Sequence, residues 1–323
     1  MVWFSKGICY KFLKSIDLAI ECFETSNSIQ KHEDTYNALG DLYLYSNDIT
    51  NAMNVYMDAI DAFPENSIFL TKCGLLYIKQ NNATDAFEHL GNSLSYNNTD
   101  PTTILAAGSI IQNNGDNDVA LTKYRIAMVH TPHNAELWSN IGLCFFGKNK
   151  LIGSVACLKR AHYLSPFDGR INYNLGVVHM HMEQFASAFH YFSASINLQK
   201  VPNLFPTREE ARCYTYLAVA LAHLDDYSNS FAAYDKSIEL SSCNNLTPDP
   251  MTHLNYAISL TKRALEDDDD DEDEGQGNSN DEKLKQIMKA KEQMSIYENT
   301  INTAVGAVLK SEDSELDEQY LVL

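Results

Sequence analysis

The feature that most constrains this chain is a glycine that returns at a constant interval of thirty-four residues. A period of this length is typical of arrays built from pairs of helices, in which each pair buries its apolar surface only against its neighbours. Such an array favours a function in binding over one in catalysis. The regular glycines are Gly40, Gly74, Gly108, Gly142 and Gly176, and Gly7 precedes Gly40 at an interval one residue shorter.

Other positions recur at fixed distances from each glycine. Large side chains stand four residues before it and three after it, which places them on one stripe of a helix. Small residues follow at the twelfth and nineteenth positions after it, and a proline ends several units. The pattern predicts two helices per unit that approach closely at the glycine. The bulky residue expected to fill the space, at the sixteenth position after the glycine, is Phe23, Tyr56, Leu90, Tyr124, Leu158 or Phe192.

This pattern resembles the tetratricopeptide repeat and predicts an all-α superhelix, an α-solenoid of about seven to eight helix pairs. The register continues at Ala218, where the interval from Gly176 is longer than the period by eight residues, so an insertion is expected between them. We place the units near residues 1–32, 33–66, 67–100, 101–134, 135–168, 169–200, 211–244 and 250–262, the last completed by a later helix.

Four segments interrupt or follow the array. Residues 201–210 contain two prolines and are predicted to form a loop between repeats. Residues 266–280 begin with nine consecutive acidic residues and are predicted to be a disordered loop, because such a run repels itself. Residues 281–310 carry apolar residues at helical spacing and are predicted to form a closing helix. Residues 311–323 form an acidic tail.

Charge and cysteine usage narrow the class of protein. The formal net charge is −19, so nucleic acid is not expected as a partner, because a phosphate backbone needs a concentrated positive surface. No run of about 18 apolar residues offers a membrane span. The seven cysteines show no paired spacing, and we expect reduced, structural thiols in a cytosolic protein.

Motifs for chemistry are scarce. His179 and His181 invite a metal interpretation, but residues two apart on a helix point about 200° away from each other. No phosphate-binding loop, zinc-protease motif or nucleophile elbow is present in the sequence. We therefore expect no catalytic residue, no cofactor and no metal site.

Partner binding is expected on the first helices, which line the inner face of tetratricopeptide arrays. The positions this implies form an apolar groove edged with amides, suited to an extended or helical peptide. The alternative is that these residues pack between successive helices. The expected groove consists of Leu75, Leu105, Asn140, Leu143, Phe146, Tyr173, Asn174, Val177 and Met180.

Two lysines bear on whether the groove binds a carboxylate. Lys72 and Lys79 alone do not make the carboxylate clamp of chaperone-binding relatives.

A basic patch is also expected. It could receive an acidic partner surface or lipid headgroups, or it could be a solvated face. The patch consists of Lys148, Lys150, Lys159, Arg160 and Arg170.

Runs between the repeat positions resemble tetratricopeptide-repeat subunits of the Bardet–Biedl syndrome protein family. They are Ile104–Ser109 (ILAAGS), Asp118–Arg125 (DVALTKYR), Trp138–Lys148 (WSNIGLCFFGK), Cys157–Asp168 (CLKRAHYLSPFD) and Tyr173–Asn197. The resemblance implies a non-enzymatic scaffold subunit of the BBSome, a coat-like complex that transports membrane proteins to and from cilia. It also implies that family members carry further repeats before the position of Met1, so we expect an amino-terminally shortened chain.

The same resemblance implies partners and a location. The partners would be other BBSome subunits, both tetratricopeptide and β-propeller proteins, and indirectly an Arf-like small GTPase, membrane and receptor tails. Centriolar-satellite and dynein-linked proteins are further partners it implies. The location would be the cytoplasm, the cilium, the ciliary base and the centriolar satellites of the centrosome. The alternative function is a tetratricopeptide adaptor that presents substrates or clients to an enzyme or chaperone.

Overall fold

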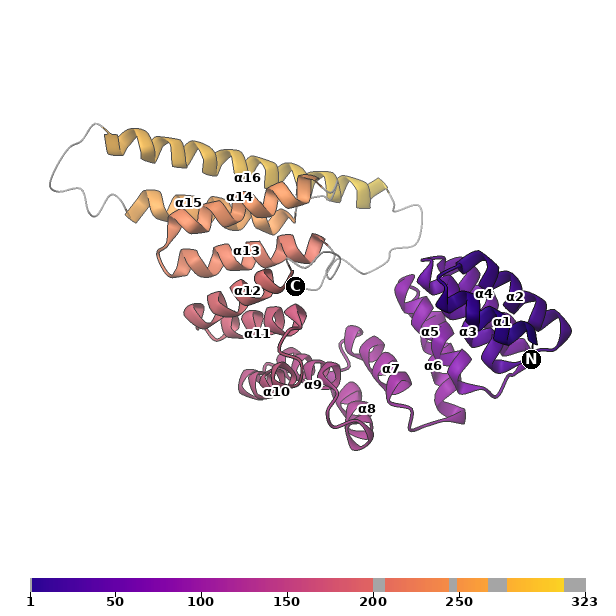
Figure 1. Cartoon of the computed structure of the whole chain (residues 1–323). Helices are drawn as coiled ribbons and strands as arrows, with labels where there is room; N and C mark the ends of the chain where they lie inside the picture. The colour runs from indigo at the N-terminus through magenta and orange to yellow at the C-terminus, as the bar shows by residue number, and fades with distance from the viewer. Residues whose placement is uncertain (1, 200–206, 244–248, 267–277, 311–323) are drawn as a thin grey trace. The chain divides into compact units, whose positions relative to one another are not determined.

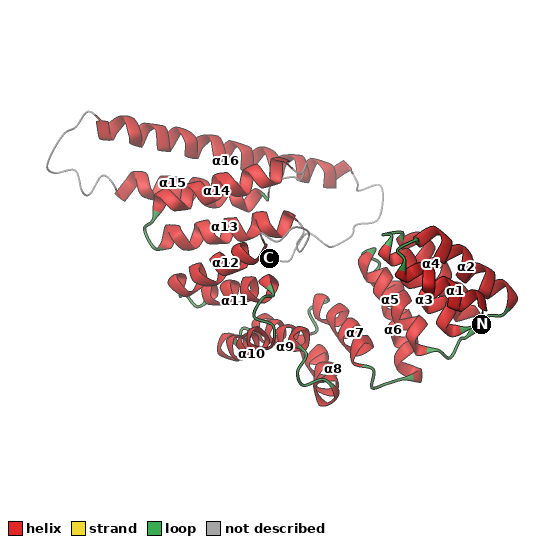
Figure 2. Cartoon of the chain, viewed as in Figure 1, coloured by secondary structure: helices red, strands yellow, loops and turns green. Residues whose placement is uncertain are grey.

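A computed structural model describes residues 2–199, 207–243, 249–266 and 278–310. Every regular element within these residues is an α-helix (Figure 2). The chain divides into two compact units, residues 1–157 and 158–323, each described by itself. Consecutive helices pair within each unit, so the predicted all-α class is confirmed for the described residues.

The first unit holds nine helices and the start of a tenth (Figure 1). They are α1 (Val2–Phe12), α2 (Ile16–Ile29), α3 (Glu33–Tyr45), α4 (Ile49–Ala62), α5 (Ser67–Lys79), α6 (Ala83–Tyr96), α7 (Pro101–Asn113), α8 (Asn117–His130) and α9 (Ala135–Gly147). The helix α10 (Leu151–Leu164) contains the boundary between the units.

The second unit continues the same alternation of first and second helices. Its elements are α11 (Gly169–His181), α12 (Phe185–Gln199), α13 (Thr207–His223), α14 (Tyr227–Cys243), α15 (Pro250–Glu266) and α16 (Asn278–Lys310).

The repeated glycines set how closely the two helices of a pair approach. A Cβ atom added at Gly7 would lie 2.7 Å from Cε1 of Phe23, and one at Gly74 would lie 2.6 Å from Cγ of Leu90. Real Cβ atoms do not approach other heavy atoms so closely. The bulky residue at the sixteenth position after the glycine therefore packs directly against the bare backbone of the first helix, as the spacing predicts.

A second recurrent position lies seven residues after each glycine, in the turn between the two helices of a pair. Its backbone is left-handed in the first seven units, where Ala218 takes the glycine position of the seventh, with φ between 56° and 88°. A residue in this conformation commonly ends a helix, and glycine and asparagine adopt it at least cost. The residues are Lys14, Asn47, Asn81, Gly115, Asn149, Glu183 and Asp225.

Capping residues also recur at the period of the repeat. Asn66, Asp100, Asn134 and Asp168 are spaced by that same period and cap the first helices of four successive pairs. The side chain of each accepts a hydrogen bond from a backbone N–H of the first turn. Each cap thereby satisfies a donor that the helix leaves unpaired.

Segment boundaries differ from those expected. Of the predicted loop 201–210, residues 207–210 are helical, because α13 begins at Thr207 and carries Glu209 and Glu210 in its first turn, where the helix dipole favours acidic residues. Residues 201–206 lie outside the described residues. The helix α15 runs to Glu266 instead of ending near residue 262, since Ala264 is still buried. The helix α16 begins at Asn278, so residues 278–280 are helical. The remainder of the predicted acidic loop and the tail 311–323 lie outside the described residues.

Candidate partner-binding groove

All nine residues of the predicted groove lie on first helices, and all nine are half-buried. Within the first unit, Leu75 packs against a cluster that includes Ala106 and Ile110 of α7. Leu105 packs against a cluster that includes Leu137 and Ile141 of α9. Both leucines therefore pack against buried clusters to which the first helix of the next pair contributes, which agrees with the packing alternative.

The same arrangement occurs within the second unit. Tyr173, Val177 and Met180 pack against the cluster that contains Phe192 and Cys213. The ring of Tyr173 is 5.9 Å from that of Phe192, and burial raises the pKa of the Tyr173 phenol. These side chains contribute to packing between successive pairs, and their role in partner binding stays a prediction. Asn140, Leu143, Phe146 and Asn174 are half-buried as well.

A hollow of about 630 Å³ lies beside α1 and α3, the first helices of the first two pairs. Most of its residues on α1 and α3 stand at the repeat positions of the expected groove, in the first two units, where the expected groove has no residue. The expected groove therefore does not include this hollow. The lining residues are Phe4, Ile8, Lys11, Phe12, Lys14, Ile16, Ala38, Asp41, Leu42 and Tyr45.

The rim of this hollow combines exposed aromatic rings with lysines. Phe12 is 83% exposed and Tyr45 is 72% exposed, although both are large apolar side chains. Lys11 and Lys14 belong to the same lining. An apolar surface beside lysines favours a partner segment that carries apolar residues flanked by acidic ones.

Asp41, which lines the hollow, forms hydrogen bonds with two neighbours. The Lys72 ammonium donates to Asp41 Oδ1 at 2.7 Å, and the Tyr56 hydroxyl donates to the same oxygen at 2.9 Å. Burial and the nearby Asp41 carboxylate raise the pKa of Tyr56, so the phenol stays a donor. Because Lys72 is engaged in this ion pair, it is not presented for a carboxylate clamp.

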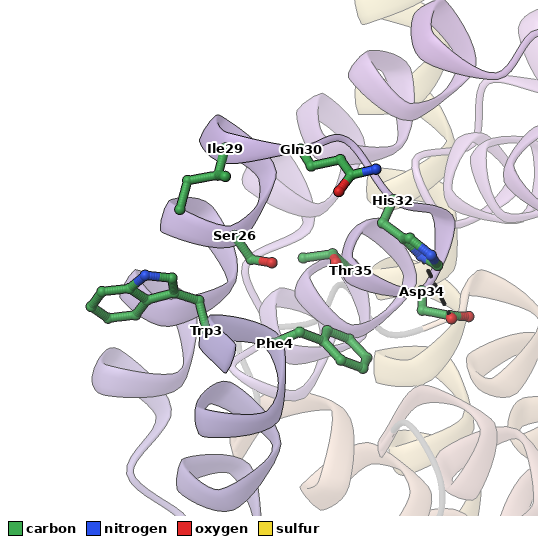
Figure 3. Close-up of a pocket in the computed structure, with 8 residues that line it drawn as sticks. All are labelled: Trp3, Phe4, Ser26, Ile29, Gln30, His32, Asp34 and Thr35. Carbon is green, nitrogen blue, oxygen red and sulfur yellow. Dashed lines mark ion pairs between the residues drawn. The ribbon is translucent and has the colours of Figure 1, made fainter. Parts of the chain in front are cut away.

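A second hollow, of about 300 Å³, lies between α1, the end of α2 and the start of α3. Figure 3 shows Trp3 of α1 and Ile29 of α2 on one side, with His32 and Asp34, 3.6 Å apart, on the other. Its polar lining consists of Ser26, Gln30, His32, Asp34 and Thr35. The two hollows share Phe4, so both lie beside α1.

The residues of the predicted basic patch are distributed over both units, so their assembly into one patch stays a prediction. In the first unit Lys148 forms an ion pair with Asp118, which lowers the pKa of that carboxyl, while Lys150 is exposed. In the second unit Arg170 pairs with Asp168 at 3.0 Å. Lys159 and Arg160 are exposed, and Arg160 lies 5.5 Å from the ring of Tyr163.

His179, Cys73 and Cys213 are buried inside the repeat packing. His179 is buried, lies 2.8 Å from Gln184 Oε1 through Nδ1, and stacks on Tyr191, whereas His181 is exposed. Burial raises the pKa of the Cys73 and Cys213 thiols to about 12, which keeps them protonated and poorly nucleophilic. No group of three metal-ligating side chains occurs among the residues that the structure describes. Within the same residues, none of the helices is both long and apolar enough to span a bilayer.

Comparisons with known proteins agree with the repeat geometry. A tetratricopeptide-repeat family model matches residues 2–32 and 33–66. BBSome complex member BBS4 of Bos taurus is 43% identical over 262 residues, which covers 81% of this chain and 48% of the relative. This chain belongs to the BBS4 family. The Mus musculus member is 45% identical over 67% of this chain and 40% of its own length, and the Drosophila melanogaster homolog is 35% identical over 64% and 41%.

The chain spans about half the length, or less, of the curated BBS4 relatives it matches. Solved structures support the fold alone. A chain of the APC/C hetero-tetramer Cut9–Hcn1 superposes with a TM-score of 0.62 at 14% identity, over 90% of this chain and 52% of its own. The type IV pilus biogenesis factor PilW superposes with a TM-score of 0.57 at 16% identity, over 66% and 94%.

Proposed function

We propose that this chain is a non-enzymatic scaffold subunit of the BBSome that acts through contacts made by its repeats. The observation that carries the proposal is the identity of 42% to 45% with relatives that are named BBSome complex members. A tetratricopeptide array presents extended surface rather than an enclosed active site, which agrees with this role. The protonated, buried thiols and the engaged His179 also favour contact over chemistry.

Within this role, the hollow on α1 and α3 is our candidate contact site for another BBSome subunit. Phe4, Ile8, Phe12 and Tyr45 supply apolar surface, and Lys11 supplies positive charge at the same place. A segment with two or more apolar side chains and an acidic flank would bury the exposed rings and meet the lysines.

The cellular role that follows is the trafficking of membrane proteins to and from cilia. The Arf-like GTPase, the membrane and receptor tails would then be reached through the assembled complex. The protein would act in the cytoplasm, at the ciliary base and at centriolar satellites. An adaptor for a chaperone has less support, because Lys72 is held by Asp41.

The proposal is tested by affinity purification of the tagged chain from ciliated cells, with subunit ratios measured by quantitative mass spectrometry. We expect other BBSome subunits, tetratricopeptide and β-propeller proteins, in a constant ratio to the chain. Recovery with a single enzyme or chaperone, while control BBSome subunits co-purify from the same cells, contradicts the proposal and supports the adaptor function.

A further inference from the structure

Helix α15 carries an apolar stripe that faces away from the rest of its unit. Ile258 is 56% exposed and Leu265 is 63% exposed, and Met251 is exposed on the same side. The residues that contact the preceding pair lie on the opposite side of the helix. Among them, Thr252 Oγ1 lies 3.0 Å from Thr215 Oγ1, and the ring of Tyr256 stacks on that of Tyr234 at 4.8 Å.

Helix α16 also exposes its apolar stripe. The regularly spaced apolar residues from which this helix was predicted point outward over much of its length, and Met288 is 61% exposed. The side chains that are buried instead include Ala290 and Gln293. Lys289, on the side of the preceding pair, reaches Asp235 of α14 at 3.3 Å. The exposed members of the stripe are Leu284, Ile287, Met288 and Met294.

The two stripes form one surface. His253 Nδ1 of α15 lies 2.6 Å from Gln293 Oε1 of α16, which fixes the register of this helix pair. The two helices run antiparallel (Figure 1), so five residues on from His253 and five back from Gln293 place Ile258 and Met288 at the same level along the pair. Both stripes lie opposite the contacts with the preceding pair. We call this surface the end face: Met251, Ile258, Leu265, Leu284, Ile287, Met288 and Met294.

Earlier repeats show what covers such a surface. Ile258 stands one residue after Ala257, the position of the repeated glycine. In two other units the residue at this position is Leu75 or Val177, and each packs against a buried cluster to which the first helix of the following pair contributes, α7 and α13 respectively. At α15 this position is exposed. The chain's own packing therefore specifies an amphipathic helix as the matching occupant.

The charge on α16 refines the chemistry of that occupant. Lys291 is exposed within the apolar stripe, and Lys285 and Glu292 are exposed together on its flank, so the charge inside the stripe itself is positive. A covering helix would therefore place acidic side chains beside its apolar ones. We propose that the end face docks an amphipathic helix of a partner protein, with apolar residues at i, i+3 or i+4, and i+7 and an acidic flank. The end face is separate in sequence from the hollow on α1 and α3, so this inference goes beyond the function proposed above.

The test uses a photo-crosslinking amino acid in place of Ile258 in the full chain, expressed in ciliated cells. The same amino acid in place of Tyr163, 76% exposed on α10 of the same unit, is the matched control. Cross-linked peptides are identified by mass spectrometry. We expect cross-links from position 258 to one segment of another protein that has the stated apolar spacing and acidic flank.

A variant decides whether the end face itself makes this contact. Leu284→Asp combined with Met288→Asp should reduce the cross-link yield at least tenfold, whereas Tyr163→Asp should leave it unchanged. Leu284→Ser with Met288→Gln gives the same comparison without added charge, and circular dichroism checks that the helices persist. Cross-links to a second copy or to another segment of this chain overturn the inference. A cross-link yield at position 258 no higher than that at position 163 overturns it as well. If BBSome subunits still co-purify in that case, the end face fails while the proposed function stands.

Discussion

A Cβ atom at Gly176 would lie 2.6 Å from Cε1 of Phe192, on the second helix of the same pair. Phe192 is fully buried, so its ring has no free space to move into. Similarly close approaches recur at Gly7, Gly40, Gly74 and Gly108. The repeat is therefore held by a bare backbone position on each first helix and a large side chain on each second helix.

Gly176→Ala should destabilise the protein. Overpacking a full core costs about 1–3 kcal/mol, which exceeds the gain of up to about 1 kcal/mol from replacing a helical glycine. Gly91→Ala is the matched control, because no atom lies within 4 Å of the added Cβ on α6. That control should be neutral or stabilising. Urea unfolding followed by circular dichroism measures both, and a destabilised Gly91→Ala with an unchanged Gly176→Ala contradicts the packing.

Buried hydroxyl groups connect successive pairs at equivalent repeat positions. Thr71 Oγ1 lies 2.8 Å from Ser93 Oγ and 2.6 Å from Thr103 Oγ1. Thr71→Val should lower the free energy of unfolding by about 1 kcal/mol or more, because buried hydroxyls lose a partner. Thr215 on α13 makes the equivalent contacts, with Ser237 and Thr252. Thr215→Val should therefore lower the free energy of unfolding by a similar amount.

The exposed Thr122→Val on α8 serves as the control for these hydroxyl variants and should change the free energy by no more than about 0.5 kcal/mol. Chemical denaturation of the three variants provides the comparison. Equal effects at Thr71, Thr215 and Thr122 would show that the buried hydroxyl contacts do not stabilise the array.

The cap of α4 should make stability depend on pH at the acidic end. Asp48 accepts hydrogen bonds from the Asn51 amide at 3.1 Å and the Thr50 hydroxyl at 2.8 Å, and these lower its pKa below the usual 3.8. A carboxyl whose pKa is lower in the folded state stabilises the fold at pH values above its unfolded-state pKa. This stabilisation is lost as the pH falls through the folded-state pKa.

Asp48→Asn keeps a capping oxygen but removes the titration. Between pH 6 and pH 3, the wild-type chain should therefore lose stability relative to Asp48→Asn. Unfolding midpoints measured at several pH values across this range give the result. Parallel curves for the two proteins would rule out a contribution from Asp48.

Glu183→Gly should stabilise the turn between α11 and α12. Glu183 has φ of 58°, and a left-handed backbone costs a residue with a side chain roughly 1–2 kcal/mol. Glycine avoids this cost but has more freedom in the unfolded chain, so we expect a net gain of at most about 1 kcal/mol. Glu183→Ala, which keeps the Cβ atom, should not give this gain. Thermal melts compare the two, and an equal response from both variants contradicts the assignment to backbone strain.

The pairing of helices was predictable because both contact positions, such as Gly74 and Leu90, recur in the sequence. The left-handed turn position was not predicted, although Asn47, Asn81 and Asn149 stand in register with Gly115 and signal it in the sequence. The side of α16 that packs was not predictable. Burial of Ala290 and Gln293 depends on the neighbouring helices, and not on where the apolar residues of α16 lie.

The candidate groove was predictable in part for a related reason. Its positions on the first helices follow from the repeat, but how deeply each side chain is buried depends on the neighbouring helices. Leu75 and Val177, one residue after their glycines, are half-buried, while Phe12 and Tyr45, five residues after theirs, are exposed. The period fixes the place of a residue on its helix, but not what packs against it.

The most direct test of the proposed function is BBSome association of the chain with Phe12→Asp and Tyr45→Asp together. Both rings are largely exposed, so the charges should weaken binding at the hollow while helical content and melting temperature stay unchanged. Ile152→Asp, at an exposed apolar residue of α10, is the control. In affinity purifications from ciliated cells, we predict at least a fivefold loss of BBSome subunits with the double variant and none with the control. Unchanged recovery of BBSome subunits with the double variant would contradict a partner-binding role for this groove, and a complete absence of these subunits from the wild-type purification would contradict membership of the complex.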